Sequence, residues 1–358
     1  MNSILEDKTY SSVKAYALKG TLIDQATYTS LAESKSIDEL IIKLKTTTYN
    51  EFISKIEQPY TSKKIEHAVK EHVSKLHFDL MKVSPANKIL SNYFLKYIIA
   101  NLKIVLKGKA LNKSYDELKD YLDLYSEELI GRRDLITRAL TADNIEDSIN
   151  TLNGTEFFKD IERAMQIYKE NPKIDIFDNY LDRSFYSNLS KTYTELNTSL
   201  MPIGSTPKVR KFRQIIAYYI DSYNILSTLR AKLWKLDDEE TKKILIEPTF
   251  DISTTTLKKI IASESIEEGI KTLESTSYNK LIPTSFTNDG EVVSQLEDNI
   301  RKHEFIKLKK TFFWNSFGDV VSLSIIRLKE FEANNLSSIA FGIENKIESK
   351  SLMSSIIV

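Results

Sequence analysis

The sequence predicts an all-α protein built from one helical unit repeated three times. Three observations support this prediction: turn-forming residues are scarce, apolar residues recur with helical spacing along almost the whole chain, and one motif occurs three times in order. Glycine occurs 9 times and proline 7 times in 358 residues, together about 4.5%, whereas average proteins contain roughly 12%. Such a composition favours long helices joined by few loops.

Helical periodicity is clearest at 93–106, 118–129 and 215–229, where apolar residues return every three or four positions. Alternating patterns longer than four residues are hard to find, so we expect no strands. Helix breakers separate the periodic segments, and we expect helices of roughly 10–25 residues between them. The breakers are Pro59, Pro85, Gly154, Pro172, Pro202, Pro207, Pro248, Pro283 and Gly290.

The repeated motif runs from 37 to 49, from 145 to 157 and from 266 to 278, without gaps. Each copy begins with isoleucine, has an acid two residues later and a leucine at the eighth position, and ends with an aromatic residue. These positions are Ile37, Glu39, Leu44 and Tyr49; Ile145, Asp147, Leu152 and Phe157; and Ile266, Glu268, Leu273 and Tyr278. Three coincidences of this kind indicate an internal repeat.

The motif has the features of a short capped helix. Ser36, Asn144 and Ser265 precede the three copies, and serine and asparagine are favoured N-caps. The acid three residues after each cap is expected to accept a hydrogen bond from the cap residue's own amide, as in a capping box. The first, fifth and eighth positions form one apolar stripe. We therefore predict equivalent helices at 37–45, 145–153 and 266–274.

A second, weaker repeat lies at 101–109, 224–232 and 321–329. Each copy ends on two basic residues, which are typical of the last turn of a helix. The pairs are Lys107 and Lys109, Arg230 and Lys232, and Arg327 and Lys329. Together the two repeats predict three helical units at 1–112, 113–236 and 237–358, in which the two chain ends are free to pack together.

Residue counts exclude several classes of protein. Cysteine is absent, so disulfides, thiolate metal sites and thiol catalysis are excluded. The closest two glycines are 21 residues apart, so no Walker A loop, dinucleotide-binding loop or nucleophile elbow can be drawn. We expect no catalytic residue, no cofactor and no directly bound nucleotide.

The charge balance bears on partners and location. Lysine plus arginine and aspartate plus glutamate each total 50, giving zero net charge, which disfavours nucleic acid and anionic lipid as ligands. The longest purely apolar stretch, 215–220, is far shorter than the ~20 residues of a membrane span. The first ten residues contain acids and no apolar core, so no signal peptide is expected. We expect a cytoplasmic protein.

Three clusters of polar residues are candidate sites. His67, His72 and His77 are spaced by five residues, about 140° per step on a helix, so we expect partly exposed surface histidines and no metal. The acidic run 237–240 is expected to start a solvated helix. The basic run 208–213 suits a nucleic acid, an acidic protein or simply solvent, and we keep it as a candidate interface. Its cations are Lys208, Arg210, Lys211 and Arg213.

The threefold arrangement, with the segments 10–28, 36–49 and 101–109, resembles the C subunit of archaeal and bacterial V/A-type rotary ATPases, which is homologous to the d subunit of the eukaryotic vacuolar ATPase. The resemblance covers the whole chain in order. The chain also departs from the family's pattern. Lysines stand where the family commonly has arginine, the third basic segment is eroded, and the tail after Glu348 has no counterpart. These lysines are Lys14, Lys103 and Lys107.

The resemblance implies a funnel of three pseudo-threefold related helical domains with a central cavity. The cavity would accept the lower end of the central stalk, a shaft made of subunits D and F, and the base would sit on the membrane rotor ring of c/K-type subunits. A contact with the membrane stator subunit is left open. A protein of this family has no catalytic residues and couples shaft to ring during proton or sodium transport. It would lie on the cytoplasmic side of the cell membrane, attached through the ring.

Two alternatives remain on the sequence alone. A helical-repeat scaffold with unrelated partners would share the repeat and differ in what it binds. An all-α enzyme of the terpene-synthase kind would need an acidic metal cluster of the DDxxD type within a helix, for which 237–240 is the nearest candidate.

Overall fold

The computed structural model describes residues 2–84, 88–200, 207–314 and 319–358; within these ranges the side chains of residues 2–8, 196–200, 207–213, 314 and 319 are not described.

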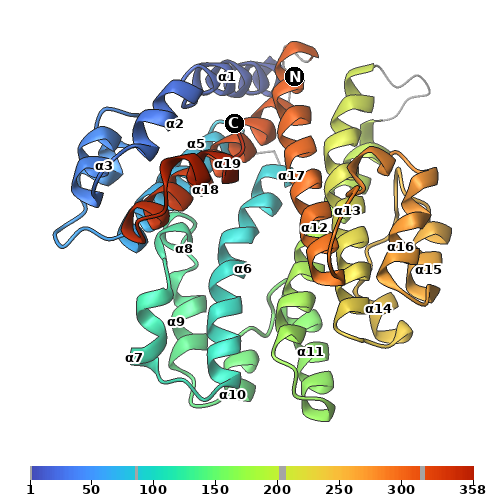
Figure 1. The fold of residues 1–358 in the computed structure, drawn as a ribbon. Helices are drawn as coiled ribbons and strands as arrows, with labels where there is room; N and C mark the ends of the chain where they lie inside the picture. Colours follow the sequence, from blue (N-terminus) through green and yellow to red (C-terminus); the bar gives the residue numbers. More distant parts are fainter. Residues whose placement is uncertain (1, 85–87, 201–206, 315–318) are drawn as a thin grey trace. The chain divides into compact units, whose positions relative to one another are not determined.

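Every regular element in the described ranges is a helix (Figure 1), so the all-α prediction is confirmed. The α-helices are α1 (Asn2–Lys19), α2 (Gln25–Ala32), α3 (Ile37–Leu44), α4 (Asn50–Ile53), α5 (Ser62–Lys82), α6 (Lys88–Ala110), α7 (Tyr115–Leu118), α8 (Tyr125–Leu129), α9 (Arg133–Thr141), α10 (Ile145–Asn150), α11 (Phe158–Glu170), α12 (Asp175–Leu200), α13 (Pro207–Leu233), α14 (Asp238–Ile244), α15 (Thr254–Ala262), α16 (Ile266–Lys271), α17 (Asp289–Trp314), α18 (Asp319–Glu344) and α19 (Ser349–Ser355). Short 3₁₀ helices are η1 (Lys119–Tyr121), η2 (Thr272–Ser275) and η3 (Asn279–Leu281).

The chain divides into two compact units. The terminal unit contains residues 1–90 and 305–358, and the central unit contains residues 91–304. The first therefore combines both ends of the chain, whereas the second is one continuous segment.

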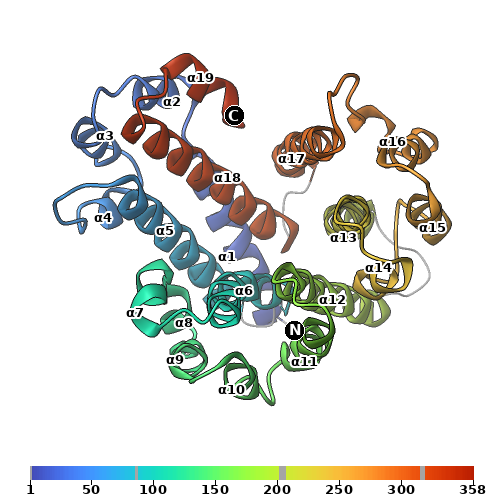
Figure 2. The same cartoon turned by 60° about the horizontal axis from the view of Figure 1, so that its bottom comes forward.

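Two long helices form the core of the terminal unit. α18 packs along α5 and also against α1 (Figures 1 and 2). On α5 the apolar residues Ile65, Val69, Val73 and Leu80 are spaced by four or seven positions and are almost completely buried, as expected for one face of an amphipathic helix. The C-terminal helix α19 packs on α2, so the two ends of the chain meet in this unit.

The central unit is organised around α12 and α13. α12 packs against α11 on one side and α13 on another, and the short helices α14, α15 and α16 contact α13 (Figure 2). Side chains that face inward on α13 are buried over most of its length, including Ile216, Ile220 and Leu229. The short helices thus share one long helix as their common support.

One helix in the described part of the chain, α6, is long and apolar enough to cross a membrane by length and composition. In its most apolar window 61% of the residues are buried inside the protein. Core helices of globular proteins commonly have this property.

Candidate functional site

The threefold motif forms the same local structure in each copy. α3, α10 and α16 begin at Ile37, Ile145 and Ile266, and the preceding cap side chain accepts a hydrogen bond from the backbone N–H three residues later. The helices end one to three residues earlier than predicted, and the third copy continues as the 3₁₀ helix η2. The tighter last turn follows from i→i+3 hydrogen bonds, such as the one from Leu152 N to Ile149 O.

The acid of each motif does not close the expected capping box. Glu39 accepts from the N–H of Lys35 and Glu268 from the N–H of Glu264, one residue before the cap in each case. Asp147 instead accepts from the side-chain amide of Asn144. The glutamates reach past the cap residue, whereas the shorter aspartate meets the cap side chain.

The end of each motif is held by a threonine. Its hydroxyl donates to the carbonyl of the stripe leucine and accepts from the N–H of the terminal aromatic residue, in all three copies. These bonds join Thr47 with Leu44 and Tyr49, Thr155 with Leu152 and Phe157, and Thr276 with Leu273 and Tyr278. The leucines and the aromatic residues are at most 2% exposed.

A second recurring contact joins an asparagine side chain to the backbone N–H and C=O of the residue 22 positions later. The amide nitrogen donates to the carbonyl, and the amide oxygen accepts from the N–H of the same residue. The three pairs are Asn101 with Asp123, Asn224 with Ile246, and Asn335 with Ile357. An asparagine side chain offers a donor and an acceptor side by side, and these match the C=O and N–H of a residue that lies outside any helix.

The asparagine pairs correct the predicted register of the weaker repeat. The segment 321–329 does not match 101–109 and 224–232, because α18 continues to Glu344 and has no basic residue in its last turn. The third asparagine is Asn335, and the third copy therefore lies fourteen residues later than predicted. Basic side chains are common on every helix, so they misled the alignment, whereas the asparagine contact fixes it.

The basic residues accordingly have different roles. Lys109 donates to the carbonyl of Ala142 at 2.6 Å, and Lys232 donates to that of Ile261 at 3.1 Å. Both carbonyls lie at the end of the helix before the motif helix. Lys329 is in mid-helix and fully buried, and it pairs with Glu332 at 2.5 Å.

Each long helix that carries the asparagine ends in the same way. A residue eleven positions after it has positive φ, and the following N–H bonds to the carbonyl five residues earlier, as in a Schellman motif. The residues with positive φ are Asn112, Lys235 and Lys346. The closing bonds join Lys113 to Gly108, Leu236 to Ala231 and Ile347 to Gly342, at 2.8–2.9 Å. A short helix follows each end: α7, α14 and α19.

α19 therefore gives the tail after Glu348 a counterpart. It is the third copy of the short helix that follows each long helix. The central unit contains two copies of the pattern, and the terminal unit contains the third, assembled from both chain ends. The predicted limits at 112 and 236 fall where α6 and α13 have just ended; as a division into domains they stay a prediction.

Two copies carry a buried carboxylate three residues before the asparagine. Asp221 accepts the backbone N–H groups of Phe250, Asp251 and Ile252. Glu332 accepts the N–H of Ile23. Ile252 and Ile23 each precede the N-cap of a helix, α15 and α2. Each carboxylate thus fixes the backbone immediately before the N-cap of the helix.

The terminal aromatic residue varies together with this carboxylate. Tyr49 donates its hydroxyl to Glu332 at 2.8 Å, and burial together with the nearby Asp221 carboxylate raises the pKa of Tyr278. In the remaining copy the carboxylate position is Ile98, which is fully buried, and the aromatic is Phe157. The copy without the acid thus also lacks the hydroxyl.

Burial shifts the ionisation of several groups. It raises the pKa of Asp221 to about 6 against the effect of the three N–H donors. It also raises the pKa of Glu127 to about 7, although Asn101 donates to that carboxylate. Burial, and then the charge of Lys329, lowers the pKa of His72 to about 4. No cluster of metal-ligating residues occurs in the described part of the chain.

The histidine prediction was wrong for His77, whereas His67 and His72 are partly exposed as predicted. His77 is completely buried and its Nε2 lies 3.0 Å from the carbonyl of Leu90. His72 is half-buried, with its ring 4.4 Å from that of Tyr49. α5 is covered on more than one face, so a five-residue spacing does not place side chains in solvent. The acidic run at 237–240 does begin α14, with Asp237 as its N-cap.

The basic candidate interface lies at the start of α13, whose backbone is helical. The side chains of Lys208, Arg210, Lys211 and Arg213 lie outside what the structure describes.

Exposed apolar side chains offer contact surfaces that the sequence did not single out. In the terminal unit, α1 and the end of α17 touch, because Tyr16 donates to the carbonyl of Phe312 at 2.8 Å. On these helices Tyr10 and Phe313 are 61% and 75% exposed. In the central unit Leu111 and Trp234 are exposed at equivalent positions, at the ends of α6 and α13. Exposed aromatic side chains commonly anchor protein–protein contacts.

Comparison with known proteins assigns the chain to a family. Three relatives are each named as the C subunit of an A-type ATP synthase. The one from Methanocaldococcus jannaschii is 25% identical over 95% of this chain and 82% of its own length. Those from Methanosphaera stadtmanae and Thermococcus onnurineus are 24% and 22% identical, over 93% and 95% of this chain and 83% and 87% of their own lengths. A family model described as ATP synthase (C/AC39) subunit matches residues 12–354, and the chain belongs to this family.

Proposed function

We propose that the chain is the C subunit of a rotary A-type ATP synthase and that it couples the central shaft to the membrane rotor ring without catalysing a reaction. The observation that carries this proposal is the match to the ATP synthase family model over residues 12–354. The relatives are named as the C subunit of A-type ATP synthases.

The threefold pattern supports the mechanical part of the proposal. We propose that the three copies surround an axis and enclose a central cavity that receives the shaft. A coupler must also be stiff. Closely packed helices supply this stiffness, because a packed interior transmits strain. The buried asparagine pairs and the tight helix ends fix each long helix to the short helix after it.

The partners in this proposal are subunits D and F of the shaft and the ring of c/K-type subunits. The chain is then peripheral on the cytoplasmic side of the membrane and attached through the ring. Exposed side chains such as Trp234 and Phe313 supply apolar anchors, because a few aromatic anchors commonly carry most of the affinity of an interface. The basic run 208–213 contributes contacts at the rim.

Binding of the purified chain to two partners tests the proposal. It should bind the D–F pair and the isolated ring, each alone and both at once, because the two contacts lie on opposite faces. Trp234→Ala removes one exposed aromatic side chain from one face, so it should weaken one partner and leave the other unchanged. A chain that binds neither partner is a scaffold for other proteins, and the coupling role is then wrong.

A further inference from the structure

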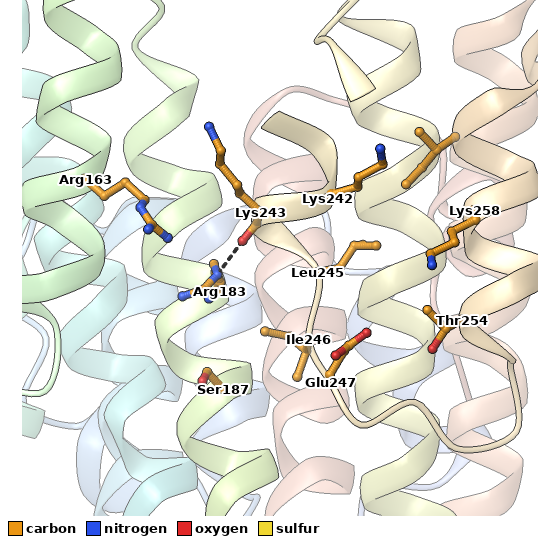
Figure 3. A pocket seen from close by; sticks show the side chains of 11 residues that line it. Arg163, Arg183, Ser187, Lys242, Lys243, Leu245, Ile246, Glu247, Thr254 and Lys258 are labelled. Carbon is orange, nitrogen blue, oxygen red and sulfur yellow. Dashed lines mark hydrogen bonds between the residues drawn. The ribbon is translucent and has the colours of Figure 1, made fainter. Parts of the chain in front are cut away.

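A basic pocket opens on the central unit, with a volume of about 490 Å³. Figure 3 shows its wall: Arg163 comes from α11, Arg183 from α12, Lys242 and Lys243 from α14, and Lys258 from α15. The segment after α14 forms the floor between these helices. Four helices thus bring cations to one concave place.

Some of these cations are already paired. Arg183 donates to the carbonyl of Lys243 at 2.6 Å and pairs with Asp160. Lys242 and Lys243 pair with the acids three residues before them on α14, at 2.7 and 2.5 Å. These pairs hold the wall in shape.

Two cations remain available. Arg163 and Lys258 are exposed, and neither side chain makes a hydrogen bond or ion pair with any residue that the structure describes. Arg163 reaches toward the pocket from α11, while Lys258 lies on the opposite wall (Figure 3). Two unpaired cations on facing walls favour an anionic occupant with more than one charge.

The other residues that line the pocket limit which kinds of anion can bind there. Leu245, Ile246 and Ile261 give it apolar surface, which suits an aliphatic side chain. Glu247 also lines it, so the negative charges of an occupant must lie apart from this carboxylate, at Arg163 and Lys258, and a compact polyphosphate cannot separate its charges in this way. A peptide that carries separate acids around an apolar residue satisfies both features.

We infer that this pocket binds an acidic peptide segment of another subunit, with at least two carboxylates that meet Arg163 and Lys258 and an apolar side chain on the floor. The inference rests on membership of a multi-subunit family, and it holds or fails independently of the coupling role.

Zero-length carbodiimide crosslinking of the assembled complex tests the contact directly, because it joins a lysine amine to a carboxylate that touches it. Lys258 should be crosslinked to an aspartate or glutamate of another subunit. The matched control is Lys259, its exposed neighbour on α15 that does not line the pocket. Intersubunit crosslinks at Lys258 no more frequent than those at Lys259 would overturn the inference.

Charge removal gives a second readout. The peptide identified by the crosslink should bind the purified chain, and Arg163→Gln with Lys258→Gln should weaken that binding roughly tenfold at low salt. Lys159→Gln with Lys259→Gln removes two exposed cations from the same two helices outside the pocket, and it should leave the affinity within about twofold. Equal losses in the two double variants would contradict a specific site. Melting temperatures of both variants check that the fold is intact.

Binding of phosphate groups is the rival outcome. Tripolyphosphate and vesicles of phosphatidylcholine with phosphatidylglycerol are the probes. If either binds in a manner that depends on Arg163 and Lys258 while the peptide does not, the site recognises phosphate and the inference is wrong. If the crosslink is absent while the chain still binds the shaft pair and the ring, only this inference falls.

Discussion

Asn224 illustrates how a single side chain fixes a helix to the segment that follows it. The residue is fully buried, and both of its hydrogen bonds to Ile246 are 2.9 Å long. A buried peptide group without a partner loses its hydration without compensation. The asparagine therefore fixes the path of the backbone that follows α14.

Replacing this residue tests its contribution. Asn224→Ala leaves two buried backbone groups unpaired and should lower the free energy of unfolding by about 2–4 kcal/mol. Asn224→Asp keeps the volume but has no N–H to donate, and it should also destabilise. Urea denaturation measures both, with Asn150→Ala at an exposed position as the control. A loss in Asn224→Ala no larger than in the control would mean that water satisfies Ile246.

Substitution in the apolar stripe of the motif should lower the free energy of unfolding more than substitution at its N-cap. Leu273 is fully buried, and Leu273→Ala should cost about 2–5 kcal/mol because it leaves a cavity. Ser265→Ala removes one exposed capping bond and should cost about 1 kcal/mol. Thermal or chemical denaturation of the two variants gives the order. The reverse order would show that the cap, and not the stripe, contributes most to the stability of the motif at 266–278.

His72 makes stability depend on pH. Its pKa is about 4 in the folded chain against the ordinary value of 6.5, so the unfolded chain binds more protons between these values. The contribution of His72 to the free energy of unfolding should therefore be complete above pH 6.5 and should fall as the pH drops toward 4, by up to about 3 kcal/mol. His72→Phe should flatten that part of the curve. Identical pH profiles in the wild type and His72→Phe would contradict this assignment.

At the scale of elements, the same helix end recurs because the same small residues recur. A Cβ atom on Gly108 would overlap the side chain of Leu118 on α7, and one on Gly342 would overlap that of Leu352 on α19. Glycine at these two places lets the short helix lie directly on the end of the long one.

A paired substitution tests this close approach. Gly108→Ala should destabilise the chain by about 1–3 kcal/mol through overpacking, in spite of alanine's higher helix propensity. Leu118→Ala makes room for the added methyl group, so the double variant should lose less than the sum of the single losses. Chemical denaturation of the four chains gives the coupling energy. Simple additivity would mean that the short helix moves away at no cost.

Sequence patterns predicted some elements well for physical reasons. Caps, stripes and terminal aromatic residues act within thirteen residues, so the starts of α3, α10 and α16 could be derived from local chemistry. The asparagine contact spans 22 residues and ends on a backbone group, which leaves no residue type to recognise at the far end. Asn101 and Asn224 do begin the two matching segments, and this shared asparagine was the available signal.

At the scale of the whole molecule, the third copy is divided between the two ends of the chain. α19 packs on α2. This contact joins residues more than 300 positions apart, so no local sequence pattern predicts it. The sequence therefore located the three short capped helices and placed the third basic segment fourteen residues too early. The basic pocket was missed for the same reason, since its cations come from four helices.

The central claim is that this chain couples the shaft to the ring, and hydrolysis-driven ion pumping in reconstituted vesicles tests it most directly. Complexes assembled with and without the chain should hydrolyse ATP at comparable rates in the catalytic head. Only the complex that contains the chain should build an ion gradient, and adding the purified chain back should restore pumping. Pumping at the normal rate in the complex that lacks the chain would contradict the account.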